Sequence, residues 1–133
     1  KDLEPCGFFD DNVWWRGVLD LLIIDKEKKL ATVIDYKTGK SSQYADTRQL
    51  SLMGVGVFKH FPEIENIKSA LMFLVSKELI KEDYSIKKVD EMFEEWGKMI
   101  HRINTAYDTD VFNAVPNFGC RWCPVLSCAH NGK

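Results

Sequence analysis

Two apolar runs decide the fold: VLDLLIID at Val18–Asp25 and LATVIDYK at Leu30–Lys37. Aliphatic side chains dominate both runs, and the first run can be extended back to Val13. We therefore predict strands over Val13–Asp25 and Leu30–Lys37. Only the polar segment Lys26–Lys29 separates them, and a connection this short joins antiparallel strands. The two runs predict a β-hairpin.

The chain after the hairpin contains a helix pattern and then two strand patterns. Asp46 suits a helix N-cap, and Gln49 lies three residues on, as in a capping box. Apolar residues recur at helical spacing from there until Pro62, which ends the helix. The continuous apolar run Ser69–Val75 predicts a buried strand, and Glu78–Ser85 predicts a strand at a sheet edge.

A second amphipathic helix is predicted from Ile86, because one apolar stripe continues at helical spacing to Ile103. The hairpin is apolar on both sides, so its sheet requires cover on both faces. We therefore expect an α/β fold with a small mixed sheet flanked by helices on both faces. Residues 1–133 are predicted to form a single domain in which residues 108–133 are a cysteine-rich loop.

Composition excludes some function classes. Eighteen basic residues against twenty acidic residues give a net charge of -2, so overall charge does not indicate a nucleic-acid partner. No apolar run approaches the roughly 18 residues that a membrane span requires, and none is expected. Any nucleic-acid function must therefore come from a local site.

Three charged residues interrupt the apolar strands: Asp20, Asp35 and Lys37. If the hairpin turns about the Glu27–Lys28 bond, residues whose numbers sum to 55 face each other, and Asp20 faces Asp35. Lys37 lies two residues from Asp35, on the same face of its strand. Two facing carboxylates repel unless a cation lies between them, and carboxylates are preferred ligands of Mg²⁺ and Mn²⁺. The alternative is a buried Asp–Lys pair that only ties two strands together.

These motifs, taken in order, resemble the PD-(D/E)XK nuclease superfamily, and specifically its RecB-like branch. The segments that carry the resemblance are Gly17–Asp20, Ile34–Lys40 and Gln49–Leu52. The resemblance implies a restriction-endonuclease-like core whose N-terminal helix, which normally precedes the hairpin, is missing from this chain. Because the chain begins at Lys1 without a methionine, we expect it to be a fragment, a processed product or an excised domain.

The resemblance also implies roles for individual residues. Asp20, Asp35 and the backbone carbonyl of Tyr36 are implied metal ligands, and Lys37 is the implied catalytic lysine. Gln49 is implied to place the lysine or the substrate, a role compatible with helix capping. Met53 occupies the position where the family usually has a tyrosine, and Tyr44 is a candidate substitute. Residues expected to contact DNA are Lys40, Tyr44 and Arg48, whereas Lys59 is interpreted as solvated charge.

Three of the four cysteines crowd the end of the chain, at Cys120, Cys123 and Cys128. Thiols this close together suggest metal or cluster ligands rather than a disulfide framework. The resemblance implies a [4Fe–4S] cluster with Cys6 as the fourth thiolate. A Zn²⁺ site with His130 as the fourth ligand, or three unligated thiols, are the alternatives.

The leading hypothesis is a Mg²⁺- or Mn²⁺-dependent deoxyribonuclease. The resemblance implies an exonuclease in recombination, repair or phage DNA processing, located in the cytoplasm, at the nucleoid or, if viral, in the host cytoplasm. DNA is the expected partner, with further domains or subunits of a larger nuclease or helicase–nuclease. One alternative is a catalytically incomplete module that binds nucleic acid or a partner. Another is a redox or iron–sulfur protein, which leaves the strand carboxylates unexplained.

Overall fold

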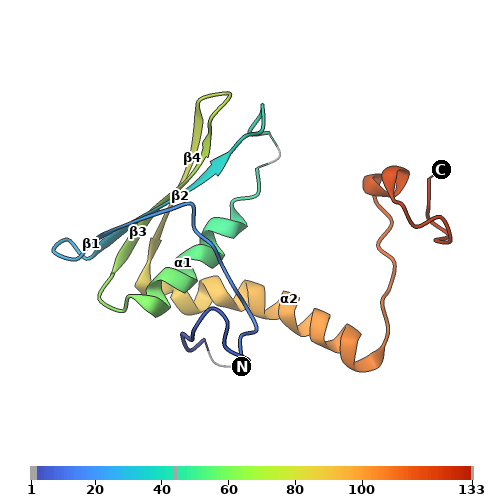
Figure 1. Cartoon of the computed structure of the whole chain (residues 1–133), viewed down its shortest axis with the longest axis horizontal. Coiled ribbons are helices and arrows are strands. Elements are labelled where there is room, and N and C mark those ends of the chain that lie inside the picture. The colour runs from blue at the N-terminus through green and yellow to red at the C-terminus, as the bar shows by residue number, and fades with distance from the viewer. Residues whose placement is uncertain (1–2, 44, 133) are drawn as a thin grey trace. The chain divides into compact units, whose positions relative to one another are not determined.

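A four-stranded mixed sheet in the order β1-β2-β3-β4 is the framework of the first part of the chain (Figure 1). The computed structural model describes residues 3–43 and 45–132. They divide into two compact units, Lys1–Lys98 (unit 1) and Met99–Lys133 (unit 2). The sheet and the helix between its two central strands belong to unit 1.

The hairpin forms with the predicted register. The strands β1 (Leu21–Asp25) and β2 (Leu30–Lys37) are antiparallel, and Leu21 pairs with Ile34, so paired residue numbers sum to 55. The first strand is shorter than predicted, because residues 13–20 leave the sheet. Trp15, within this segment, instead packs on the helix that follows the hairpin. A Cβ added at Gly56 would lie only 2.8 Å from the Trp15 ring.

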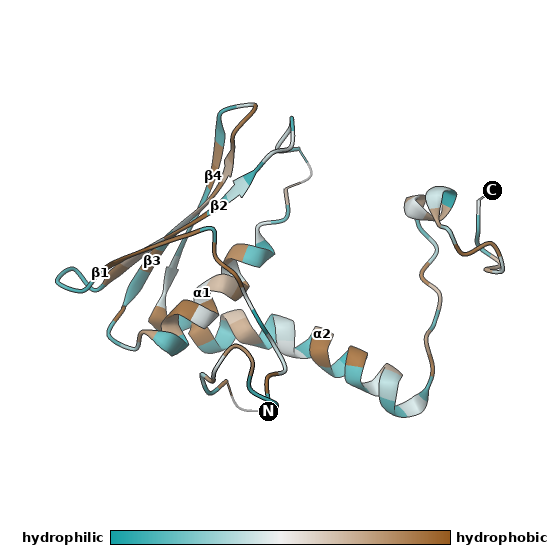
Figure 2. Cartoon of the chain, in the orientation of Figure 1, coloured by the Kyte–Doolittle hydropathy of each residue, from teal (hydrophilic) through white to brown (hydrophobic). Residues whose placement is uncertain are grey.

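Helix α1 (Arg48–His60) connects β2 to β3 (Asn66–Phe73), which runs parallel to β2. The edge strand β4 (Glu78–Ser85) has the predicted bounds and pairs with β3 in antiparallel orientation. A 3₁₀ turn at Ile86–Lys88 then leads into α2 (Val89–Thr109). The strand β1 is hydrophobic, whereas the β1–β2 turn is hydrophilic (Figure 2).

The core of unit 1 lies between the sheet and α1. Alternate residues of β2, Ala31, Val33 and Asp35, are buried on this side, and Leu71 of β3 packs against Leu50 of α1. The fully buried large side chains of the core are Leu50, Ile64, Ile67, Leu71, Val33 and Val55.

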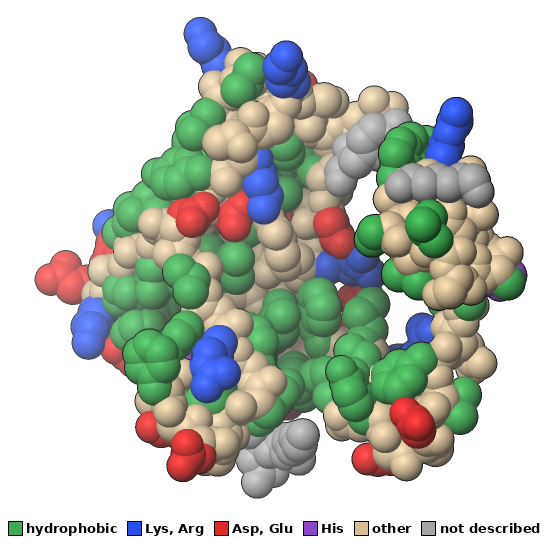
Figure 3. All heavy atoms as spheres, turned by 45° about the vertical axis from the view of Figure 1, so that its right-hand side comes forward, with side chains coloured by type: hydrophobic (Ala, Val, Ile, Leu, Met, Phe, Trp, Pro, Cys, Tyr) green, Lys and Arg blue, Asp and Glu red, His purple; other side chains and the backbone are tan. Residues whose placement is uncertain are grey.

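The α/β class with a small mixed sheet is confirmed, but the helical cover differs from the expectation. Helix α1 contacts β2, β3 and β4, and Val89 and Met92 of α2 pack into the same core cluster as α1. Within the described residues of unit 1, both helices therefore cover the same face of the sheet. The opposite face keeps apolar side chains exposed, Ile23 and Leu79 among them, and Figure 3 shows hydrophobic side chains at the molecular surface. The sequence pattern shows that a face of the sheet is apolar, but it does not identify the element that covers that face.

Unit 2 contains the end of α2 and a turn-rich segment with a short 3₁₀ helix, Phe118–Trp122. Asn117 caps this helix by accepting a hydrogen bond from the Gly119 amide at 2.8 Å. The Asn131 amide group donates to the carbonyls of Cys123 and Val125, and the Gly132 amide donates to the carbonyl of Cys120. These bonds hold the cysteine-bearing turns together. Among the described residues, no helix has the length and hydropathy needed to cross a membrane.

Candidate active site

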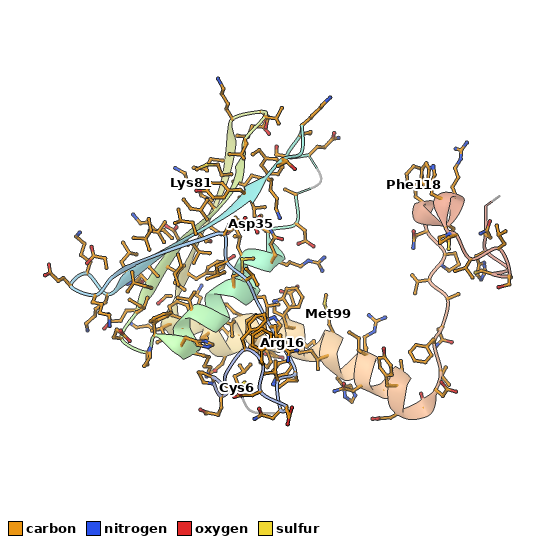
Figure 4. All side chains as sticks on the ribbon, in the orientation of Figure 1. Cys6, Arg16, Asp35, Lys81, Met99 and Phe118 are labelled. Atoms are coloured by element: carbon orange, nitrogen blue, oxygen red, sulfur yellow. The ribbon has the colours of Figure 1, made fainter. Side chains whose placement is uncertain are left out.

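Asp35, Lys37 and Gln49 form one hydrogen-bonded group at the end of β2 and the start of α1. Lys37 Nζ lies 2.7 Å from Asp35 Oδ2 and donates to Gln49 Oε1 at 3.2 Å. Gln49 Nε2 donates to Asp35 Oδ2 at 3.4 Å. The Asp35 side chain is 12% exposed and that of Lys37 is 34% exposed. The Asp35 carboxylate (labelled in Figure 4) is thus buried, while the adjacent Lys37 side chain is partly exposed.

Strand geometry explains this grouping. Asp35 and Lys37 are two apart on β2, so both side chains point to the face that α1 covers. Gln49 lies in the first turn of α1, where the helix begins above that end of the strand. A buried carboxylate needs partners, and Lys37 and Gln49 supply them.

Asp20 lies just before β1 and is exposed. Its Oδ2 accepts a hydrogen bond from the backbone amide of Tyr36 at 2.8 Å, which attaches the carboxylate to β2 between Asp35 and Lys37. The paired register ends at Leu21, so this hydrogen bond, and not the strand ladder, holds Asp20 beside β2. The structure therefore brings all three predicted strand residues to one end of the hairpin.

Gln49 does not act as a helix cap, so the capping-box interpretation of Asp46 and Gln49 was wrong. The N-cap of α1 is Thr47, which makes no side-chain capping bond. Asp46 accepts from the Arg48 backbone amide at 3.0 Å instead. Gln49 is consequently free to bond Asp35 and Lys37, which only the packing of α1 on β2 could reveal.

The residues expected to contact DNA lie in different local environments. Arg48 forms a forked pair with Asp46, with Nε–Oδ1 at 2.9 Å and NH2–Oδ2 at 2.5 Å. This hydrogen bonding lowers the pKa of Asp46 to about 2 and raises the pKa of Arg48. Lys40 is exposed in the loop after β2. Tyr44 lies outside the described residues.

The cysteines fall into both units. Cys6 is exposed in unit 1, whereas Cys120, Cys123 and Cys128 are half-buried in unit 2, where His130 is exposed. The Asn117 amide donates to Cys120 Sγ at 3.4 Å. Within residues 3–43 and 45–132, no three His, Cys, Asp or Glu side chains form a group arranged to hold a metal ion.

A pair of carboxylates beside a lysine, on the strands of a mixed sheet, defines a class of metal-dependent phosphodiesterases. A family model of the PD-(D/E)XK nuclease superfamily matches residues 3–128, and the chain belongs to this superfamily. No curated protein and no solved structure matches the chain significantly. Members of the superfamily are generally nucleases that act on nucleic acid and use Mg²⁺ or Mn²⁺.

The donor set fits such a cation. Asp20 and Asp35 supply carboxylate oxygens from adjacent chain segments, and oxygen ligands are what Mg²⁺ and Mn²⁺ prefer. Among the described residues, one Asp20 oxygen has no hydrogen-bond donor, so it is available to a cation. A bound cation supplies Lewis-acid chemistry to the phosphate. Lys37 places a positive charge beside Asp35, and Gln49 accepts a hydrogen bond that holds the lysine in place.

Replacing Gln49 by alanine is expected to lower the rate of metal-dependent DNA cleavage about 10- to 100-fold, because Lys37 and Asp35 lose the residue that orients both. Apparent affinity for DNA should change little. The measurement is the initial rate against DNA concentration, with Gln43→Ala, an exposed amide in the preceding loop, as the matched control. Equal cleavage rates for the two variants would contradict a role for Gln49 in the site.

Proposed function

We propose that the chain is the nuclease domain of a Mg²⁺- or Mn²⁺-dependent DNA exonuclease of the RecB-like branch, acting in recombination, repair or phage DNA processing. The observation that carries the proposal is the group of Asp35, Lys37 and Gln49 beside Asp20. Asp20, Asp35 and the Tyr36 carbonyl would hold the cation, and Lys37 would act on the phosphate. Both units are taken to work as one nuclease domain.

The charges at the site favour catalysis over simple nucleic-acid binding. Two carboxylates repel a phosphate unless a cation is present, so a module that only binds DNA gains nothing from them. Lys37 and Gln49 satisfy the buried Asp35, but a structural Asp–Lys pair leaves the second carboxylate, Asp20, unexplained. The catalytically incomplete binding module is therefore the alternative outcome of the test below.

The test combines metal binding with cleavage by the full chain. We expect Mn²⁺ to bind in a calorimetric titration, and end-labelled linear DNA to be degraded with Mn²⁺ or Mg²⁺ but not with excess EDTA. Asp35→Asn keeps the side-chain shape and should lose both properties. A chain that binds DNA without binding Mn²⁺ or cleaving would establish the binding-module alternative instead. Products released as mononucleotides from an end, and the absence of cuts in circular DNA, would establish exonuclease action.

The cysteine turns of unit 2 support a second metal site. Cys120, Cys123 and Cys128 lie within one set of hydrogen-bonded turns, and the Asn117 amide donates to Cys120 Sγ. We infer that these three cysteines hold a [4Fe–4S] cluster or, with His130 as the fourth ligand, Zn²⁺. Iron, zinc and sulfide analysis of anaerobically purified protein decides between them. A folded protein free of both metals would contradict this inference.

The setting follows from the substrate. A nuclease of this kind acts where DNA is handled, so we infer the cytoplasm, the nucleoid or a virus-infected host's cytoplasm. Further domains or subunits of a larger nuclease or helicase–nuclease are the proposed protein partners. Co-purification of the chain with a helicase subunit from cells that encode it would support this setting, and isolation as a lone, fully active chain would contradict it.

A further inference from the structure

A cavity of about 590 Å³ lies in unit 1 between the N-terminal segment and α1. Residues 3–8 and 12–17 form one wall, and the C-terminal part of α1 forms the other. Trp15 contributes to the first wall, and its ring is pressed against the helix at Gly56, where a Cβ would lie 2.8 Å away. The absence of a side chain at position 56 thus sets the position of this indole.

The lining combines aromatic rings with positive charge. Its aromatic side chains are Phe8, Trp14, Trp15 and Phe61. Arg16 and Lys59 contribute two cations, while Glu4 is the acidic residue of the lining. Arg16 Nε donates to the Phe8 carbonyl at 2.6 Å, which fixes the guanidinium on the N-terminal wall (Figure 4).

The cavity adjoins the candidate active site. Leu19, which directly precedes Asp20, is part of the lining. So is Met53, which lies four residues after Gln49 and therefore one turn along the same side of α1. The lining therefore comes within one residue of Asp20 and within one helical turn of Gln49.

We propose that the cavity holds the unpaired end of a single DNA strand, with an unstacked base against Trp15 and backbone phosphates near Arg16 and Lys59. The proposal rests on the proposed nuclease function and names the form of its substrate. Aromatic faces beside cations are what bind single strands independently of sequence. The volume falls in the range of about 300–1,000 Å³ that suits small ligands, which is enough for one or two nucleotides but not for a duplex. The sequence alone led to the interpretation of Lys59 as a solvated charge. Its place in the lining gives it a proposed role beside a backbone phosphate.

The experiment measures binding without cleavage. The fluorescence anisotropy of a labelled six-nucleotide oligo-dT is measured as the full chain is added in EDTA. A labelled blunt hairpin duplex is titrated in the same way for comparison. We expect the single strand to bind more tightly than the duplex, and Lys59→Glu to weaken its binding about tenfold. Lys26→Glu makes the same charge change on the exposed β1–β2 turn, outside the lining, and should leave binding unchanged. Equal binding by the two variants, or tighter binding of the blunt duplex, would overturn the proposal.

A second readout uses the position of Trp15. Gly56→Ala inserts a methyl group where the ring now lies, so we expect it to weaken oligo-dT binding without Lys59 being touched. Circular dichroism confirms that the variant is folded, and an unfolded variant leaves the Lys59→Glu comparison to decide. Because binding is measured in EDTA, a chain that binds single strands but never cleaves would contradict the nuclease function alone. A chain that cleaves yet shows no Lys59 effect would contradict the cavity alone.

Discussion

Lys37→Ala is expected to lower the rate of Mn²⁺-dependent DNA cleavage by about 10²- to 10³-fold, the usual loss when one group that stabilises transition-state charge is removed. The Lys37 ammonium lies 2.7 Å from Asp35 Oδ2 and its side chain is partly exposed, so its charge can reach a phosphate bound to a cation at the two carboxylates. Mn²⁺ binding should persist, because the ligands Asp20 and Asp35 remain. Single-turnover cleavage and calorimetric Mn²⁺ titration measure the two quantities separately.

The control for this variant is Lys29→Ala, which removes an exposed lysine from the β1–β2 turn and should cleave at the normal rate. Lys37→Ala also leaves Asp35 without its cation, so thermal unfolding must show that the variant is folded under assay conditions. Lys37→Arg restores the charge and should recover part of the rate. Undiminished cleavage by a folded Lys37→Ala protein would rule out the catalytic role of the lysine.

Leu71→Ala is expected to lower the free energy of unfolding by about 2–5 kcal/mol, the range for large-to-small changes at fully buried positions. Leu71 is 0% exposed and packs against Leu50 and Phe73. It also pairs with Asp35 across the parallel β2–β3 ladder, so the resulting cavity lies beside the site. Urea unfolding followed by circular dichroism gives the change in free energy.

Leu79→Ala is the matched control for this second prediction. It is the same substitution on the neighbouring edge strand, where the side chain is 44% exposed on the opposite face. Because much of that side chain is already in water, we expect a loss well below that of Leu71→Ala. Equal losses for the two variants would show that the core does not lie on the α1 side of the sheet.

Some of the site could be predicted from local pattern alone. The two apolar runs and the four-residue break determine the hairpin and its register, which brings Asp20 to the end of β2 that carries Asp35. The bounds of β2 and β4 also match the predictions. These features depend on neighbours in the chain, which is why a single sequence reveals them.

Other features depend on contacts between distant segments. Gln49 bonds Asp35 and Lys37 instead of capping its helix, because α1 begins directly over the end of β2. Residues 13–20 lie outside the sheet, and within them the Trp15 ring packs against α1 at Gly56. Amino-acid order alone thus determined the hairpin, its register and the acidic pair with its lysine. Only the tertiary structure decided which face the helices cover, what Gln49 binds and where the aromatic cavity lies, because local periodicity records the polarity of a surface and not the segment that packs against it.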